Sequence, residues 1–351
     1  SCCELLVLLS FNRTSPNLCT AHVLVANSPL SFVAPMLASR RTLQLCSKGT
    51  RFSRALINTS TNSTMKIPAL VTPESCFDGI TDFPYVPSYL DNVVGGLRLA
   101  YYDIPAQNAL HNNSVFLCLH GTPTWSYLYR HMIPELVTSG RVLCVDLLGF
   151  GRSNKPTSDY SFSLHRTALL SLVDRLNLQN ITLVVQDWGG ILGLTLPLES
   201  PRRYSRLLLM NTLLPLEPEC STLAMDLKTE ANQSGFAQWH NFSQASDDWD
   251  VGQLIHVTCR KQLTPQTVAA YNAPYPSQDY KAGVNVFPRL VPLSPTQDGY
   301  AIGREALHFW QHHWTGPTFL AVGARDRVIP PSLMKRMASS IRGCSEPLML
   351  P

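Results

Sequence analysis

The segment Val185-Gln186-Asp187-Trp188-Gly189-Gly190 places an acid beside a tryptophan where a strand is expected to turn into a helix. It follows the apolar run at residues 181–185 and precedes a helical stretch at residues 191–198. A sharp strand-to-helix turn exposes its central residue and directs backbone N–H groups at whatever lies above it. We therefore interpret Asp187 as a carboxylate nucleophile; the alternative is that it only caps the following helix.

A carboxylate nucleophile implies a reaction in two steps. Because the ordinary pKa of an aspartate is about 4, the group is ionised at neutral pH and needs no base for its attack. Displacement of a leaving group from saturated carbon would leave an ester on Asp187, and water would then have to attack the ester carbonyl. That second step needs a general base and an oxyanion hole. The backbone N–H groups of Thr122 and Trp188 are the candidate donors, although Thr122 also suits an ordinary strand-to-helix turn.

Buried strands and helices are expected to alternate along most of the chain and to position these groups. Strands are expected at residues 97–104, 115–119, 141–146, 181–185, 207–210 and 318–322, and helices at residues 125–137, 164–176, 191–198 and 301–314. This alternation predicts an α/β fold with a mainly parallel sheet covered on both faces. Active groups in such a sheet gather at the carboxyl ends of the strands.

The chain divides into a leader, a core in two parts, and an insertion. Residues 1–64 are basic, rich in Ser and Thr, and expected to be disordered; they resemble an organelle transit peptide or untranslated sequence read in frame. Residues 65–212 and 299–351 are expected to form the core. Between them, residues 213–298 are rich in proline and aromatic side chains, which favours a helical cap over a long irregular loop. We expect a cytoplasmic protein, or a chloroplast or mitochondrial one if the leader is a transit peptide.

Composition excludes several classes of function. Residues 65–351 hold 22 basic and 23 acidic side chains, so no basic stripe indicates nucleic acid. No apolar run reaches the 18 residues that a membrane-spanning helix needs. The ten cysteines form no C-x-x-C pair, which argues against a zinc site.

Three motifs in order resemble haloalkane dehalogenases of the α/β-hydrolase superfamily, in the branch with two halide-binding tryptophans. They are His120-Gly121-Thr122-Pro123-Thr124-Trp125-Ser126-Tyr127-Leu128, Asp146-Leu147-Leu148-Gly149-Phe150-Gly151-Arg152-Ser153 and the segment around Asp187. The resemblance runs from about Met65 to the last residue. It implies an α/β-hydrolase fold with a helical cap after the sixth strand. It also implies hydrolysis of an alkyl halide to an alcohol and a halide ion, without cofactor or metal.

The resemblance also implies residue roles. Asp187 would be the nucleophile and Trp188 one halide donor. Within Gly235-Phe236-Ala237-Gln238-Trp239, Trp239 would be the second donor and Phe236 would line the pocket. Two indole N–H groups in a dry pocket suit a poorly hydrated anion. Trp239 could instead be a core aromatic, with Trp249 as the rival position.

Asp326, in Val322-Gly323-Ala324-Arg325-Asp326-Arg327-Val328, matches the acid that orients the family's catalytic histidine. Taken alone, it could also cap a helix that starts near Pro331. The family's histidine follows the last strand, and no histidine of this chain follows Asp326. Residues 344–350 resemble the entry to that strand. We therefore expect a truncated chain that lacks the histidine base, the last strand and the closing helix, and that alkylates Asp187 without turning over.

Two rival functions remain open. An epoxide hydrolase would need cap acids, for which Tyr271, Tyr275 and Tyr280 are available. A non-catalytic ligand-binding pseudoenzyme would be a chain that has lost its base. The expected partners are a small apolar halogenated substrate, halide ion and water, and we expect a monomer.

Overall fold

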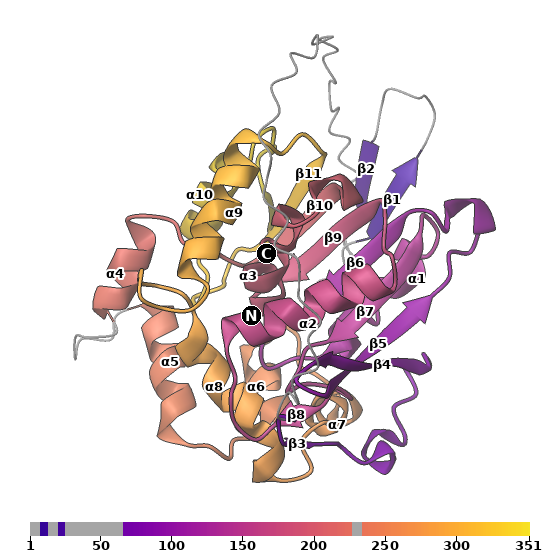
Figure 1. Ribbon diagram of the computed structural model, residues 1–351, viewed down its shortest axis with the longest axis vertical. Coiled ribbons are helices and arrows are strands. Elements are labelled where there is room, and N and C mark those ends of the chain that lie inside the picture. The colour runs from indigo at the N-terminus through magenta and orange to yellow at the C-terminus, as the bar shows by residue number, and fades with distance from the viewer. Residues whose placement is uncertain (1–7, 13–19, 25–65, 227–233) are drawn as a thin grey trace, which may run out of the picture.

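The computed structural model describes residues 8–12, 20–24, 66–226 and 234–351 (Figure 1). Within the predicted leader, β1 (Leu8–Asn12) and β2 (Thr20–Leu24) pair as an antiparallel sheet of two strands. These ten residues therefore differ from the disordered leader expected at residues 1–64. The rest of the leader lies outside the described residues. No helix of the described part is long and apolar enough to cross a membrane.

The core is one eight-stranded sheet with the strand order β12-β11-β10-β9-β6-β7-β5-β4. The strands are β4 (Pro87–Val94), β5 (Leu97–Ile104), β6 (Val115–Leu119), β7 (Arg141–Asp146), β9 (Ile181–Gln186), β10 (Tyr204–Met210), β11 (Thr318–Gly323) and β12 (Leu348–Leu350). The six from β6, β7 and β9 to β12 run parallel, whereas β5 is antiparallel to β7 and β4 is antiparallel to β5. The mainly parallel sheet is confirmed. A separate small ladder joins β3 (Ala69–Leu70) to β8 (Lys155–Pro156).

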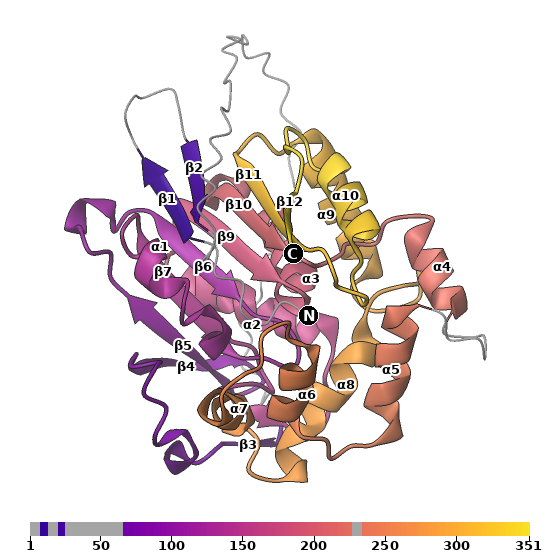
Figure 2. The same cartoon turned by 180° about the vertical axis from the view of Figure 1, so that it is seen from behind.

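Helices cover both faces of the sheet. In Figure 1, α2 (Phe162–Arg175) crosses the near face together with α3 (Trp188–Gly193). The view from behind in Figure 2 shows α1 (Ile133–Leu136) on the other face. Beside β11 lie α9 (Tyr300–His312) and α10 (Pro331–Ser339), which confirm the helices expected there.

Two predicted helices are shorter than expected. The helix over residues 125–137 is instead the 3₁₀ turn η3 (Ser126–Tyr129) followed by the separate short helix α1, whose second residue, Pro134, has no N–H to donate to the preceding turn. The helix over residues 191–198 begins earlier, at Trp188, and ends at Gly193. Its continuation is a 3₁₀ turn at Leu196–Leu198, where Pro197 has no N–H to extend the helix.

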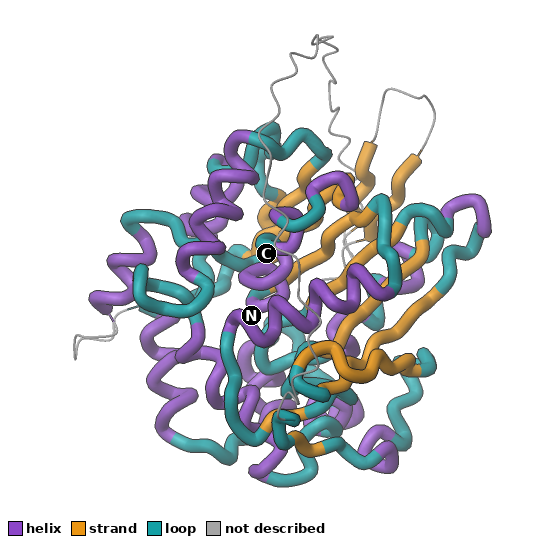
Figure 3. The backbone as a smooth tube through the Cα atoms, viewed as in Figure 1, coloured by secondary structure: helices purple, strands orange, loops and turns teal. Residues whose placement is uncertain are grey.

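Five helices lie between β10 and α9, in the stretch where strands and helices were expected to stop alternating. They are α4 (Glu219–Asp226), α5 (Gly235–Ala245), α6 (Val251–Thr258), α7 (Pro265–Asn272) and α8 (Ala282–Leu290). We call this stretch the insertion. It follows the sixth strand of the large sheet. Figure 3 shows its helices together beside one end of the sheet.

The edge of the sheet differs from the expectation that the last strand is missing. Residues Leu348–Leu350 form β12, which pairs in parallel with β11 through Ala321 and Leu348 and through Gly323 and Leu350. At these positions the edge of β11 that faces away from β10 is therefore paired with β12. The prediction of an absent last strand is therefore wrong for these three residues.

Candidate active site

Asp187 lies at the turn between β9 and α3. Its backbone has φ 49° and ψ −124°, a left-handed conformation that residues with a side chain rarely adopt. The two glycines that follow have no room for a side chain: a Cβ at Gly189 would collide with the Leu119 carbonyl, and one at Gly190 with the side chain of Thr212. The sequence Asp187-Trp188-Gly189-Gly190 therefore forms a tight turn wedged between the ends of β6 and β10.

Both predicted oxyanion-hole donors contact the carboxyl group of Asp187. The Thr122 N–H donates to Asp187 Oδ1 over 2.8 Å, and the Trp188 N–H also bonds the carboxyl group. Gly121 makes this approach possible, because a Cβ there would collide with the carboxylate. The oxygen held by Thr122 is in the position where the carbonyl oxygen of an ester on Asp187 would lie.

Burial controls the ionisation of Asp187. Loss of contact with water raises the pKa of Asp187 to about 6, since a charged carboxylate is less stable away from solvent. The two backbone N–H donors lower the pKa, and the charge of Asp326 raises it. At pH 7 and above most of the Asp187 population is therefore ionised.

Asp326 lies in the turn after β11 and faces the same cavity as Asp187. Its Oδ1 accepts hydrogen bonds from the N–H groups of Val328 (2.8 Å) and Ile329 (2.9 Å). The cap residue of α10 is Pro330 and no side chain caps that helix, so the alternative interpretation of Asp326 as its cap is not supported. The structure thus brings the two predicted carboxylates to one place from two strand ends.

The cavity between these strand ends and the insertion has a volume of about 120 Å³. Its walls are mostly apolar, and they combine loop residues of the core with residues of α5 and α6. The lining residues are Thr122, Pro123, Thr124, Leu128, Gln186, Asp187, Trp239, Leu254, Ile255, Thr258, Asp326, Val328 and Ile329.

Of the two predicted halide donors and the predicted pocket residue, only one lines the cavity in the described part. Trp239 lines the cavity. The Trp188 side chain is 1% exposed and packs on Phe287 of α8 with ring centroids 4.7 Å apart. Its backbone bonds the nucleophile, but the residue does not line the cavity in the described part. Phe236 is buried beside His240, and the structure does not bring it into the cavity wall.

The rival tryptophan is occupied elsewhere. Trp249 donates its indole N–H to Asn285 Oδ1 over 2.9 Å, and its ring packs edge-on against Trp239 at 5.7 Å. Within the described residues, the indole N–H groups of Trp188 and Trp239 make no hydrogen bond. These two groups, rather than Trp249, have a donor available for an anion.

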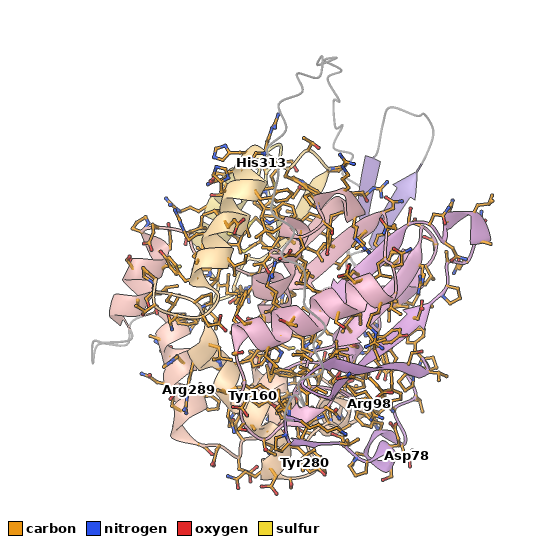
Figure 4. All side chains as sticks on the ribbon, in the orientation of Figure 1. Asp78, Arg98, Tyr160, Tyr280, Arg289 and His313 are labelled. Atoms are coloured by element: carbon orange, nitrogen blue, oxygen red, sulfur yellow. The ribbon has the colours of Figure 1, made fainter. Side chains whose placement is uncertain are left out.

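Among the described residues that line the cavity there is no histidine. His120 lies nearby but is committed to the fold, since its Nδ1 donates to the Gly121 carbonyl (2.9 Å) and its Nε2 accepts from the Leu147 N–H (3.0 Å). His313, which follows α9, lies at the end of the molecule opposite α6 (Figure 4).

Tyrosines are also missing from the described lining of the cavity. Tyr271 is buried against Arg130, and Tyr275 donates to the Pro123 carbonyl over 3.4 Å. Tyr280 lies at the start of the α8 region, in the 3₁₀ turn Gln278–Lys281. None of these hydroxyls faces the nucleophile from the cavity wall.

The contacts of Asn211 and Thr212 with Asp187 were not predicted from the sequence. The Asp187 N–H donates to the Asn211 carbonyl (2.8 Å), and the Thr212 hydroxyl donates to the Asp187 carbonyl (2.6 Å). Their position directly after the apolar strand β10 was the available signal, because this places them at the same edge of the sheet as Asp187. The lining residues of α6 had no comparable signal in the sequence.

The described residues contain no group of three or more His, Cys, Asp or Glu side chains arranged to hold a metal ion. Cys118 and Cys144 are both buried thiols on the neighbouring strands β6 and β7.

Comparison with known proteins agrees with this geometry. A sequence profile of the alpha/beta hydrolase fold matches residues 114–347. The chain is 40% identical over 270 residues to a haloalkane dehalogenase of Psychrobacter cryohalolentis, covering 75% of this chain and 83% of the relative. It is 37% identical over 268 residues to the haloalkane dehalogenase of Mycolicibacterium paratuberculosis, covering 74% and 83%.

A solved haloalkane dehalogenase from Paraglaciecola agarilytica, a tetramer, superposes with a TM-score of 0.72 at 38% identity. The match covers 81% of this chain and 92% of that one. The relative is a tetramer, whereas the monomer that we expect for this chain stays a prediction. The fold, the motifs around Asp187 and these relatives together place the chain in the haloalkane dehalogenase family, hydrolases with the α/β-hydrolase fold that act on carbon–halide bonds.

Proposed function

We propose that this chain attacks a small halogenated alkane with Asp187 and forms a covalent alkyl ester. A carboxylate oxygen of Asp187 bonds the carbon that carries the halogen, and the carbon–halogen bond breaks with its electron pair leaving as halide. The observation that carries the proposal is the Thr122 N–H at 2.8 Å from Asp187 Oδ1. It fixes one oxygen and leaves the other to react.

The departing halide needs hydrogen-bond donors without a positive charge, because a cation would bind the Asp187 carboxylate instead. The indole N–H of Trp239, which lines the cavity, suits this role, and we propose that of Trp188, beside Asp187 in the turn, as the second donor. Both groups carry no net charge and have no other hydrogen-bond partner in the described part. Apolar walls around them exclude water and strengthen each interaction with the anion. The cavity of about 120 Å³ favours substrates with few carbon atoms.

Hydrolysis of the ester would place a negative charge on the oxygen that Thr122 holds, and the Trp188 N–H is the second candidate donor to it. Water would attack the Asp187 carboxyl carbon, a proton would pass to a base, and the alcohol would leave. Asp326 is positioned to orient a base, but no histidine lines the described cavity. We therefore propose that this 351-residue chain completes the first step and accumulates the ester.

Incubation with 1,2-dibromoethane tests the proposal. Intact-protein mass spectrometry should show one bromoethyl adduct, and peptide mapping should place it on Asp187. One equivalent of bromide should be released per chain. The Asp187→Asn variant should form no adduct. Absence of an adduct in the native chain would favour a pseudoenzyme, and sustained bromide release would show that a base is present.

An epoxide hydrolase is the weaker candidate. Its reaction requires an acid that protonates the opening oxygen, and the described cavity wall offers no tyrosine for this purpose. Incubation with styrene oxide should therefore yield no diol and no ester on Asp187. Diol formation would favour that candidate instead.

A further inference from the structure

The two residues that follow β10 hold the backbone of the nucleophile on both sides. Asn211 and Thr212 are fully buried. The Asp187 N–H donates to the Asn211 carbonyl over 2.8 Å, and the Thr212 hydroxyl donates to the Asp187 carbonyl over 2.6 Å. Both backbone polar groups of Asp187 are thus bonded from the neighbouring strand end.

These contacts act where the backbone is strained. Asp187 has a positive φ, a conformation that persists for a residue with a side chain only when its surroundings determine it. The first turn of α3 also bonds the Asp187 carbonyl, through the N–H groups of Gly190 (2.9 Å) and Ile191 (3.0 Å). Those bonds come from the same turn and move with it. Of the three bonds to the Asp187 carbonyl, only the Thr212 bond comes from the end of another strand.

The second glycine of the turn makes room for this bond. A Cβ at Gly190 would collide with the Thr212 side chain, both its hydroxyl and its methyl group. The missing side chain at position 190 is therefore what lets the Thr212 hydroxyl reach the Asp187 carbonyl. Two residues that lie far apart in the sequence fit each other here.

The Asn211 side chain extends the same support to the second carboxylate. Its Oδ1 accepts from the Gly323 N–H (2.8 Å), and its Nδ2 donates to the Ile329 carbonyl (3.0 Å). Gly323 and Ile329 are the two ends of the turn that carries Asp326, and the Ile329 N–H donates to Asp326 Oδ1 (2.9 Å). One dipeptide therefore fixes the nucleophile and the acid relative to each other.

We infer that Thr212 is a positioning residue for the nucleophile and that Asn211 sets the place of Asp326 beside it. Thr212 acts through the Asp187 backbone. Its hydroxyl holds the turn so that the reactive carboxylate oxygen points at the substrate carbon while Thr122 holds the other. The inference rests on the proposed role of Asp187.

The test compares Thr212→Val, which keeps the shape and removes the hydroxyl, with Thr212→Ser, which keeps the hydroxyl. Single-turnover alkylation by 1,2-dibromoethane is followed by intact mass, giving a maximal rate and a half-saturating concentration. In Thr212→Val the maximal rate should fall about tenfold, the effect of losing one well-aligned hydrogen bond. The half-saturating concentration should stay the same, because the residue does not line the described cavity. Thr212→Ser should stay within about twofold of the native rate.

Thr195→Val is the matched control. Thr195 is also fully buried and donates its hydroxyl to a backbone carbonyl, that of Leu192 (2.7 Å), but it does not contact Asp187. It should lose stability comparably, as followed by urea unfolding, and keep its maximal alkylation rate. The inference is wrong if Thr212→Val alkylates at the native rate, if Thr195→Val slows as much, or if Thr212→Ser is as slow as Thr212→Val. A native chain that forms no adduct would instead refute the proposed function.

Discussion

Replacing the proposed nucleophile by asparagine should stabilise the protein at neutral pH. Asp187 is fully buried, and its raised pKa means that the folded protein prefers the protonated acid. Asparagine has nearly the same shape, and its carbonyl oxygen can accept the N–H groups of Thr122 and Trp188. The variant therefore keeps the turn and removes the buried charge.

The magnitude follows from the two pKa values. The folded value is about 6 and the ordinary value is 3.8. At about 1.4 kcal/mol for each tenfold change in proton affinity, this difference corresponds to about 3 kcal/mol. Because the folded pKa is the higher one, the contribution is favourable below pH 3.8 and is lost as the pH rises through about 6. Above pH 7 the native protein carries the whole cost and the variant none of it.

Urea unfolding of the native chain and Asp187→Asn at pH 4 and pH 7.5 measures this difference. The variant should be more stable by about 3 kcal/mol at pH 7.5 and close to equal at pH 4. Asp78→Asn, at an exposed position, controls for the loss of one negative charge. A variant that is no more stable at pH 7.5, or equally more stable at both pH values, would refute the reasoning.

Three further outcomes follow from the site. The rate of Asp187 alkylation should rise with pH through the pKa of about 6 and level off above about pH 7, where most of the carboxylate is ionised; a flat profile between pH 5 and 8 would contradict this. Trp239→Phe should slow alkylation about tenfold, whereas Trp249→Phe should change it little, as bromide release in the first turnover would show. Gly190→Ala should lower the free energy of unfolding by about 1–3 kcal/mol, because the new Cβ collides with Thr212; a native-like urea midpoint would count against the clash.

The sheet could be predicted from the sequence where strands are apolar on both faces. Residues of β5, β6 and β7 were predicted with their observed bounds, since helices cover both sides and leave a continuous apolar run. The edge strand β4 was not predicted, because its exposed side chains break that pattern and it is recognised only through its antiparallel pairing with β5.

The site could be predicted in part. Asp187 follows β9 directly and Asp326 lies three residues after the end of β11, so strand prediction alone places both at the same edge of the sheet. The position of Phe236 depends on how α5 packs, and its sequence neighbours are equally compatible with a cavity wall or a buried core. The interruption of the helix at residues 125–137 was missed although Pro134, which has no N–H for a helical hydrogen bond, lies inside the predicted span.

The contacts that hold the nucleophile were the hardest to foresee, and the reason is energetic. Asp187 combines a strained backbone with a buried charge, two features that each destabilise a fold and that local sequence preferences disfavour. They are tolerated because Asn211 and Thr212 bond the turn from a different strand. Such support depends on the register of β9 against β10, which brings Gln186 opposite Met210 and so places the next residues side by side. A sequence pattern shows where a strand ends, but only the register decides which residue of the neighbour meets the nucleophile there.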